Sequence, residues 1–127
     1  VVVREILSAN SSEIVVVAEF ENVIAEQLGT VKILMDNGQT VLRPDSWLYN
    51  LPGEIVGVTP SSGQNQTRVT LTGIRMLNRG TSVASVHLAG TAAIVVDGND
   101  TVVNVIAQAS GPVSGDVTIV SDTGSIE

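Results

Sequence analysis

The chain contains one histidine, His87, which lies in an apolar run typical of a β-strand. A Ser-His-Asp triad would require an acid on one side of the imidazole and a nucleophile on the other. No G-x-S-x-G segment or comparable signature accompanies His87. We therefore interpret His87 as a strand residue that faces solvent, and we expect neither catalysis nor a cofactor.

Turn-like segments with carboxylates occur at 97–100 and 36–38. The segment 97–100 reads Asp-Gly-Asn-Asp, and hard oxygens of this kind bind Ca²⁺. It lacks the alternating ligands and terminal Glu of an EF-hand loop, and the related segment 9–12 contains no acid. We predict plain β-turns here and at 36–38, where Asn-Gly favours a type I′ hairpin. No metal site is expected.

The basic and aromatic residues are few. Arg68, Arg75 and Arg79 could form a small anion-binding patch, but isolated solvated charges are the simpler interpretation. Trp47 and Tyr49 lie on one face if their segment is extended. They could stack on sugar rings or pack in a core or at a module junction.

Three N-x-S/T sequons begin at Asn10, Asn65 and Asn99, all in predicted turns that a glycosyltransferase could reach. Three is a mild excess over chance. N-glycosylation is expected at these sites if the protein passes through a eukaryotic secretory pathway.

Composition indicates an all-β protein. The 127 residues are 43% hydrophobic but only 2% aromatic, with Val, Thr, Ser and Gly prominent. Val and Thr suit a pleated sheet and lose side-chain freedom in helices. The absence of Cys excludes disulfides.

The formal net charge of −7 argues against nucleic-acid binding, which requires basic surface, and against docking to an anionic membrane. No apolar run is long enough to predict membrane insertion. No signal peptide begins at Val1, and we expect the numbering to begin within a longer precursor.

Apolar alternation and turn residues predict a series of short strands, with a looser connection at 21–29. The expected strands are 1–7, 13–20, 30–35, 39–42 with 46–49, 55–58, 68–72, 83–88, 91–96, 102–107 and 116–121.

The most specific pattern is the segment 54–74, EIVGVTPSSGQNQTRVTLTGI. A strand that ends in Thr-Pro, a Ser-Ser-Gly turn and a following T-x-V-T-x-T-G strand resemble the opening of an IPT/TIG module. The resemblance implies an immunoglobulin-like antiparallel β-sandwich, in which a late aromatic packs in the core or at the junction. On that basis we favour packing for Trp47 and Tyr49.

The two ends of the chain also resemble each other. Residues 6–17 match 94–105 at an offset of 88, and 29–38 match 115–124 at an offset of 86. The match predicts tandem modules: 1–51 is the C-terminal half of one IPT/TIG-like module, 52–53 is a linker, and 54–127 is a second module without its last strand.

A half module leaves its inner face and sheet edges uncovered. Three explanations remain open. The segment can belong to a long tandem array, the two parts can form one sandwich, or copies can exchange strands to build a filament.

The expected function is a non-catalytic structural or adhesive repeat of a large extracellular or cell-surface protein. Its partners would be neighbouring modules or copies of itself, with glycans or a surface protein as further candidates. The alternative is a carbohydrate- or protein-binding module of a receptor or secreted enzyme. A Rel-like dimerisation domain resembles the family too, but the acidic balance argues against it.

Overall fold

The computed structural model describes residues 3–19 and 24–127 as strands, turns and connecting segments without helix. All strand pairs are antiparallel. The all-β prediction is therefore confirmed. Val1 and part of the expected 21–29 connection lie outside the described residues.

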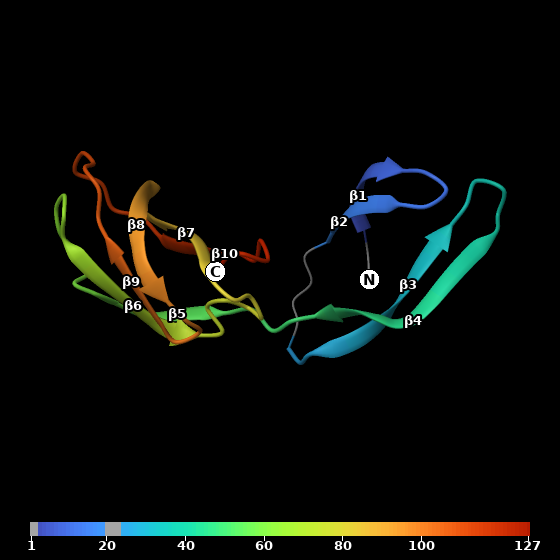
Figure 1. Ribbon diagram of the computed structural model, residues 1–127, viewed down its shortest axis with the longest axis horizontal. Helices are drawn as coiled ribbons and strands as arrows, with labels where there is room; N and C mark the ends of the chain where they lie inside the picture. Colours follow the sequence, from blue (N-terminus) through green and yellow to red (C-terminus); the bar gives the residue numbers. More distant parts are fainter. Residues whose placement is uncertain (1–2, 20–23) are drawn as a thin grey trace. The chain divides into compact units, whose positions relative to one another are not determined.

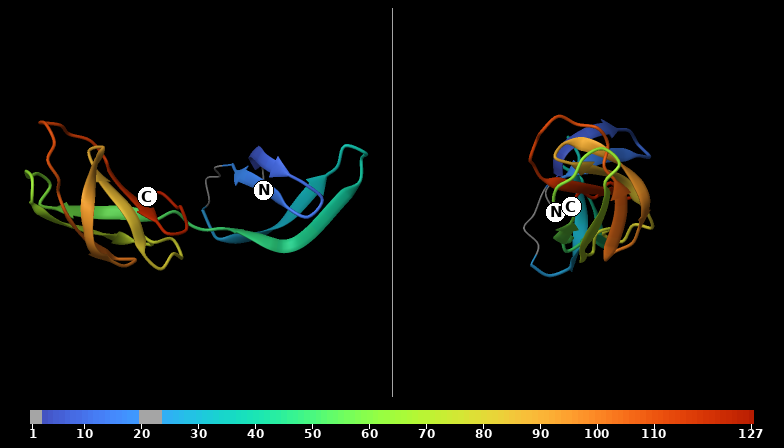
Figure 2. Two further views of the ribbon diagram at one scale, coloured as in Figure 1. Left: turned by 45° about the horizontal axis from the view of Figure 1, so that its top comes forward. Right: turned by 90° about the vertical axis from the view of Figure 1, so that its left-hand side faces the viewer.

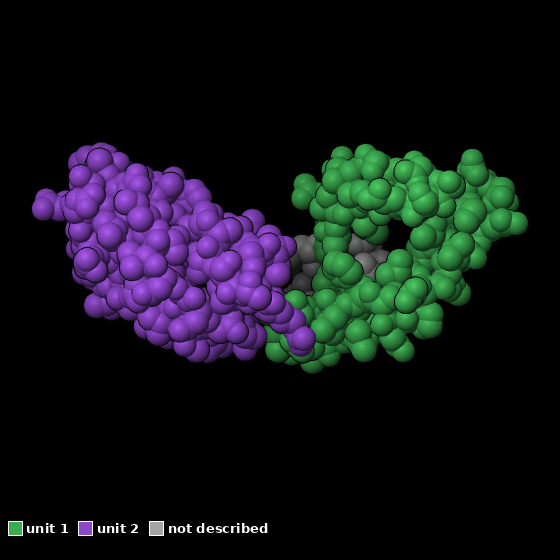
Figure 3. Space-filling view, viewed as in Figure 1, with its two compact units in different colours: residues 1–51 green, residues 52–127 purple. Residues whose placement is uncertain are grey.

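The chain forms two compact units, Val1–Leu51 (unit 1) and Pro52–Glu127 (unit 2), coloured separately in Figure 3. Unit 1 contains β1 (Val3–Ala9) and β2 (Ile14–Ala18) as one hairpin and β3 (Gln27–Leu34) and β4 (Thr40–Tyr49) as another. No described residue of unit 1 is fully buried. Its two hairpins therefore lack a closed core of their own.

Unit 2 holds six strands in the order β10-β7-β8-β9-β6-β5. The strands are β5 (Glu54–Thr59), β6 (Arg68–Ile74), β7 (Val83–Leu88), β8 (Thr91–Gly98), β9 (Val102–Ile106) and β10 (Val117–Ser121).

Strand β8 divides its pairing between two neighbours. Its first residues, from Thr91 to Ala93, pair with β7, and its later residues, from Ile94 to Gly98, pair with β9. The sheet consequently curls around its inner face, as Figures 1 and 2 show. This antiparallel arrangement is consistent with a β-sandwich.

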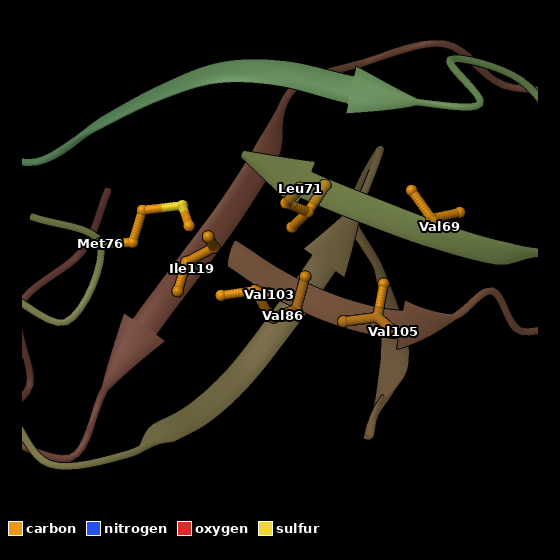
Figure 4. Packing of buried hydrophobic residues seen from close by; sticks show 7 residues of the cluster. All are labelled: Val69, Leu71, Met76, Val86, Val103, Val105 and Ile119. Carbon is orange, nitrogen blue, oxygen red and sulfur yellow. The ribbon is translucent and has the colours of Figure 1, made fainter. Parts of the chain in front are cut away.

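The core of unit 2 is aliphatic. Alternate residues of the strands point inward because successive side chains of a strand lie on opposite faces. Figure 4 shows them meeting from β6, β7, β9 and β10, joined by Met76 from the loop after β6. The cluster comprises Val69, Leu71, Met76, Val86, Val103, Val105 and Ile119.

Several predicted strand bounds were wrong by two or three residues. Strand β3 begins at Gln27, within the expected 21–29 connection, because Gln27 pairs with Tyr49, and β4 runs without the expected break at 43–45. Strand β6 continues to Ile74 rather than Thr72, β1 to Ala9 rather than Leu7, and β8 to Gly98 rather than Val96. The reason is that cross-strand pairing persists to the last pair before each turn, Ala9 with Ile14 and Gly98 with Val103.

The predicted type I′ turn at 36–38 was also wrong. Only Gly38 has a positive φ, of 84°, whereas a type I′ turn requires positive φ at both central residues. Gly38 N–H donates to Met35 O at 3.0 Å, and Met35 N–H donates to Gln39 O at 2.8 Å. The hairpin therefore has a three-residue loop that ends in a left-handed glycine.

Candidate interaction surfaces

Two hairpins of the chain have the same pairing 89 residues apart. In β1–β2, Ile6 pairs with Val16 and Ser8 with Val15; in β8–β9, Val95 pairs with Val105 and Asp97 with Asn104. Both ladders carry their irregularity between these two pairs. The offset of 88 predicted for this part of the chain was therefore one residue short.

A second correspondence follows at an offset of 86, as predicted. Leu34 pairs with Thr40 at the start of β4, and Val120 pairs with Ile126 beyond β10. The intervening turns also match. Gly124 N–H donates to Ser121 O at 3.0 Å, the bond that Gly38 makes to Met35. The segment 125–127 is thus equivalent to the beginning of β4.

Equivalent residues differ sharply in exposure. Val103 and Val105 are 0% and 1% exposed in unit 2, and their counterparts Ile14 and Val16 are 39% and 42% exposed in unit 1. The reason is that β6 pairs with β9 over Arg68–Ile106 to Thr72–Val102, whereas β2 has β1 as its only strand neighbour among the described residues. The surface that β6 covers on β9 in unit 2 is therefore exposed at the equivalent position of unit 1.

The first surface of interest is the exposed apolar surface of unit 1, which includes residues from both faces of its strands. Figure 3 shows an opening between the two hairpins of the unit in green. Its exposed large hydrophobic residues come from all four strands and their connections: Val3, Ile6, Leu7, Ile14, Val15, Val16, Ile24, Leu28, Leu34, Met35, Val41, Leu42 and Trp47.

The second surface is a cavity of about 650 Å³ at one pole of unit 2. Its apolar walls include Val58, Val69, Leu88 and Val117. The rims come from the turn 60–65 after β5 and from the segment 107–115 between β9 and β10. Neither rim belongs to a strand, so loop segments distant in sequence shape the opening.

The aromatic pair lies at the end of β4. The rings of Trp47 and Tyr49 meet edge to face, with centroids 5.8 Å apart and an interplanar angle of 81°. Trp47 pairs with Gly29 across the hairpin and remains 40% exposed. The Tyr49 hydroxyl donates to Glu19 O at 3.1 Å. Both rings therefore belong to the fold of unit 1 and are partly accessible.

His87 lies on β7, half-buried, opposite Thr118 on one side and Ala92 on the other. The interpretation of a solvent-facing histidine is thus modified to a partly covered one. Two of the three arginines share one loop. Arg68 begins β6, whereas Arg75 and Arg79 lie in the loop that follows β6. Arg75 Nε donates to Pro52 O at 3.0 Å.

The carboxylates and amides near the β8–β9 turn hold the fold together. Asp97 Oδ1 accepts Asn104 Nδ2 at 2.7 Å, and Asp100 Oδ1 accepts the Leu77 N–H at 2.9 Å. Asn99 Oδ1 accepts the N–H groups of Thr101 and Val102, both at 2.9 Å. Among the described residues, no group of three or more His, Cys, Asp or Glu side chains is arranged to hold a metal ion.

All three sequon asparagines are exposed and lie outside the strands. Asn10 and Asn99 occupy the same position of equivalent turns, and Asn65 lies on the rim of the cavity. At Asn10 and Asn99 the Oδ1 atom is used by the turn, whereas the atom that carries a glycan is Nδ2.

Comparison with family models, curated proteins and solved structures finds no match to this chain. In the part of the chain that the structure describes, no helix is long and apolar enough to span a membrane. The functional argument therefore depends on the internal geometry of the two units.

Proposed function

We propose that the chain is a non-catalytic structural or adhesive repeat of a large extracellular or cell-surface protein. The observation that carries this proposal is the repetition of pairing, bulge and turn between unit 1 and unit 2. Tandem modules repeat in this way because each copy is one folding unit joined to the next by a short link.

The finer assignment is an IPT/TIG-type module in tandem. It is supported by the strand-turn-strand at 54–74, where β5 ends at Thr59 and β6 returns from Arg68 in an antiparallel pair. The antiparallel sheets of both units favour a mechanical role, since backbone ladders between neighbouring strands resist extension along the chain. The short connection at Leu51 and Pro52 would limit the freedom of successive modules.

Extracellular location is the second part of the proposal. It is supported by three exposed sequons, two of them at equivalent turn positions. Intact mass before and after glycosidase treatment, on protein from a eukaryotic secretory host, tests it. A mass above 13.2 kDa that falls on treatment is the expected result. An unmodified chain from that host would argue against the glycoprotein part of the proposal.

The array itself is tested separately by native mass and by unfolding. If the chain belongs to a tandem array of modules, units 1 and 2 unfold in separate transitions. If copies exchange strands, the chain forms a ladder of oligomers. A compact monomer with one cooperative transition over the whole chain would contradict both.

A binding module is the second candidate, favoured by the 40% exposure of Trp47 on the face that bears Tyr49. The ring planes are 81° apart and cannot form one flat platform for a sugar. Titration with glycans, followed by Trp47 fluorescence, distinguishes the candidates. Saturable quenching or a spectral shift would favour binding, and an unchanged spectrum would favour the structural repeat.

A further inference from the structure

We propose that unit 2 binds an extended strand of the β4 type along the free edge of β10, and that the Trp-x-Tyr pair of this strand fills the cavity at the pole. The occupant has the chemistry of Thr40–Tyr49: apolar residues at its start, a cation in the middle and two aromatic rings at its end. The inference goes beyond the proposed function, because it depends on the pairing geometry and the cavity of unit 2 and holds wherever the protein is located.

The edge of β10 is already occupied at one end. Ile119 N–H donates to Glu127 O and Glu127 N–H donates to Ile119 O, both at 2.9 Å. Ser121 N–H donates to Ser125 O at 3.0 Å. Figure 1 shows the C-terminal end of the chain beside β10. The edge therefore accepts an antiparallel strand in the register that β4 adopts on β3.

The rest of the edge is open to continuation. Backbone groups of alternate residues in a strand point to the same side. The backbone groups of Ile119 and Ser121 point toward the segment 125–127. Those of Val117 and Gly115 therefore point to the same side of β10. On β3 the corresponding residues, Val31 and Gly29, pair with Arg43 and Trp47 of β4.

Strand β10 is shorter than its counterpart β3. Strand β3 begins at Gln27, whose counterpart in unit 2 is Val113, but β10 begins only at Val117. The segment 113–116 is not strand in unit 2, although its counterpart 27–30 is strand in unit 1. A strand along this edge would extend β10 to the length of β3.

The cavity lies where the aromatic residues of such a strand would point. Cross-strand partners project to the same face of a sheet. Gly29 faces Trp47 in unit 1, and its counterpart Gly115 lines the cavity together with Val117, Leu88 and Ala89. The space directly above Gly115 is filled by Ala89, since a Cβ on Gly115 would lie 3.1 Å from Ala89 Cα. A Trp opposite Gly115 would therefore reach past Ala89 into the apolar part of the cavity, beside Leu88 and Val117.

The decisive experiment extends the full chain after Glu127 with residues 42–51, LRPDSWLYNL, because Glu127 is equivalent to Val41. The extension is made in the Trp47→Phe background, so that the added Trp is the sole fluorophore of its kind. We expect blue-shifted Trp emission and slowed amide exchange at Gly115 and Val117. Solvent-like emission with unchanged exchange would overturn the proposal.

The matched control inserts one Gly between Glu127 and the extension. A shift of one residue moves every side chain of the strand to the other face. We expect the blue shift and the amide protection to be lost. Equal effects with and without the inserted Gly would show unspecific hydrophobic adhesion and would also overturn the proposal.

A second measurement decides the matter if the extended chain does not fold. A peptide of residues 39–51 is added to the unmodified protein, and the amide resonances of unit 2 are followed by NMR. Saturable shifts concentrated at residues 113–119 support the strand site. No shifts, or shifts spread over unit 1 and absent from 113–119, contradict it.

Discussion

Asn10 and Asn99 hold equivalent turns with the same set of hydrogen bonds. Asn10 Oδ1 accepts the N–H groups of Ser12 and Glu13, both at 2.8 Å, and Asn99 Oδ1 accepts those of Thr101 and Val102, both at 2.9 Å. In each turn the Asn N–H also bonds to the carbonyl three residues later. The Oδ1 atom of each Asn therefore holds the turn that joins the two strands of its hairpin.

We expect Asn99→Ala to lower the stability of unit 2 by about 1 kcal/mol, because two turn N–H groups lose their acceptor. Asn99→Asp keeps the acceptor and should have a much smaller effect. Urea unfolding, followed by amide signals of unit 2, measures both variants. Equal losses for Ala and Asp would contradict the role assigned to Oδ1.

The same pair of variants separates folding from modification. Asn99→Asp and Asn99→Ala both remove the sequon, so a change caused by the glycan appears in both when the protein comes from a glycosylating host. A change caused by the turn appears chiefly in Asn99→Ala, and it persists in unglycosylated protein.

The second prediction compares Val105 with Val16, which occupy the same position of equivalent hairpins. Val105 is 1% exposed and Val16 is 42% exposed. Val105→Ala removes buried methyl groups and leaves a cavity, and we expect it to cost about 2 kcal/mol of unit 2 stability. Val16→Ala should change the stability of unit 1 by less than about 0.5 kcal/mol.

The two units require separate probes, because a chain of two units need not unfold in one step. Trp47 is the only Trp and reports on unit 1, and amide exchange at β6 and β9 reports on unit 2. If Val16→Ala proved as costly as Val105→Ala, the face of unit 1 would be covered in solution, which would contradict the exposure described above.

Much of this architecture is predictable from the chain because strands and turns leave local signals. The strand Val83–Leu88 and the start of β8 at Thr91 coincide with the apolar runs between turn residues. The order of the strands in the sheet is not local information. Pairing of β6 with β9, across more than thirty residues, depends on which faces can be buried together.

The one-residue error in the hairpin alignment has a physical cause. The runs around Ile6 and Ile94 are apolar over several consecutive residues, so a slip of one position still matches apolar with apolar. The structure fixes the register through a bulge and through the Asn side chain, and neither produces an apolar pattern. A comparison anchored on Asn10 and Asn99 would have given the observed offset.

The cavity of unit 2 was not predictable for a different reason. Its rims, 60–65 and 107–115, are polar loops that carry no signal of concavity. Only the correspondence of β10 with β3 suggests a strand site beside the cavity. Trp47 and Tyr49, in contrast, are two residues apart on the extended strand β4, whose alternation places both side chains on one face.

The third prediction concerns the pH dependence of unit 2. The hydrogen bond from the Thr81 hydroxyl, together with the N–H of Thr81 at 3.0 Å, lowers the pKa of Asp122 below its ordinary value of 3.8. The unfolded state therefore binds the proton more tightly than the folded state. This contribution to stability is fully present above pH 3.8 and is lost as the pH falls through the folded pKa.

Asp122→Asn should remove this part of the acid sensitivity of unit 2, and Thr81→Val should reduce it. Asp36 occupies the equivalent turn in unit 1, so Asp36→Asn is the matched control and should leave the profile of unit 2 unchanged. Unfolding of unit 2 measured between pH 2 and 6 provides the test. An identical acid profile for wild type and Asp122→Asn would refute the assignment.

The last prediction concerns the close approach of β5 and β6 at Gly73. A Cβ on Gly73 would run into the backbone carbonyl oxygen of Glu54 and would lie 2.9 Å from Met76 Sδ. The carbonyl belongs to the paired strand and cannot move without breaking the ladder, so we expect Gly73→Ala to destabilise unit 2 by about 1–3 kcal/mol.

Gly111→Ala is the control, because its Cβ would meet nothing within 4 Å. Thermal unfolding should show a lower midpoint for Gly73→Ala and an unchanged one for Gly111→Ala. Equal midpoints would mean that β5 is not held against β6 at this distance, and that the edge of the sheet next to Glu54 is looser than the pairing indicates.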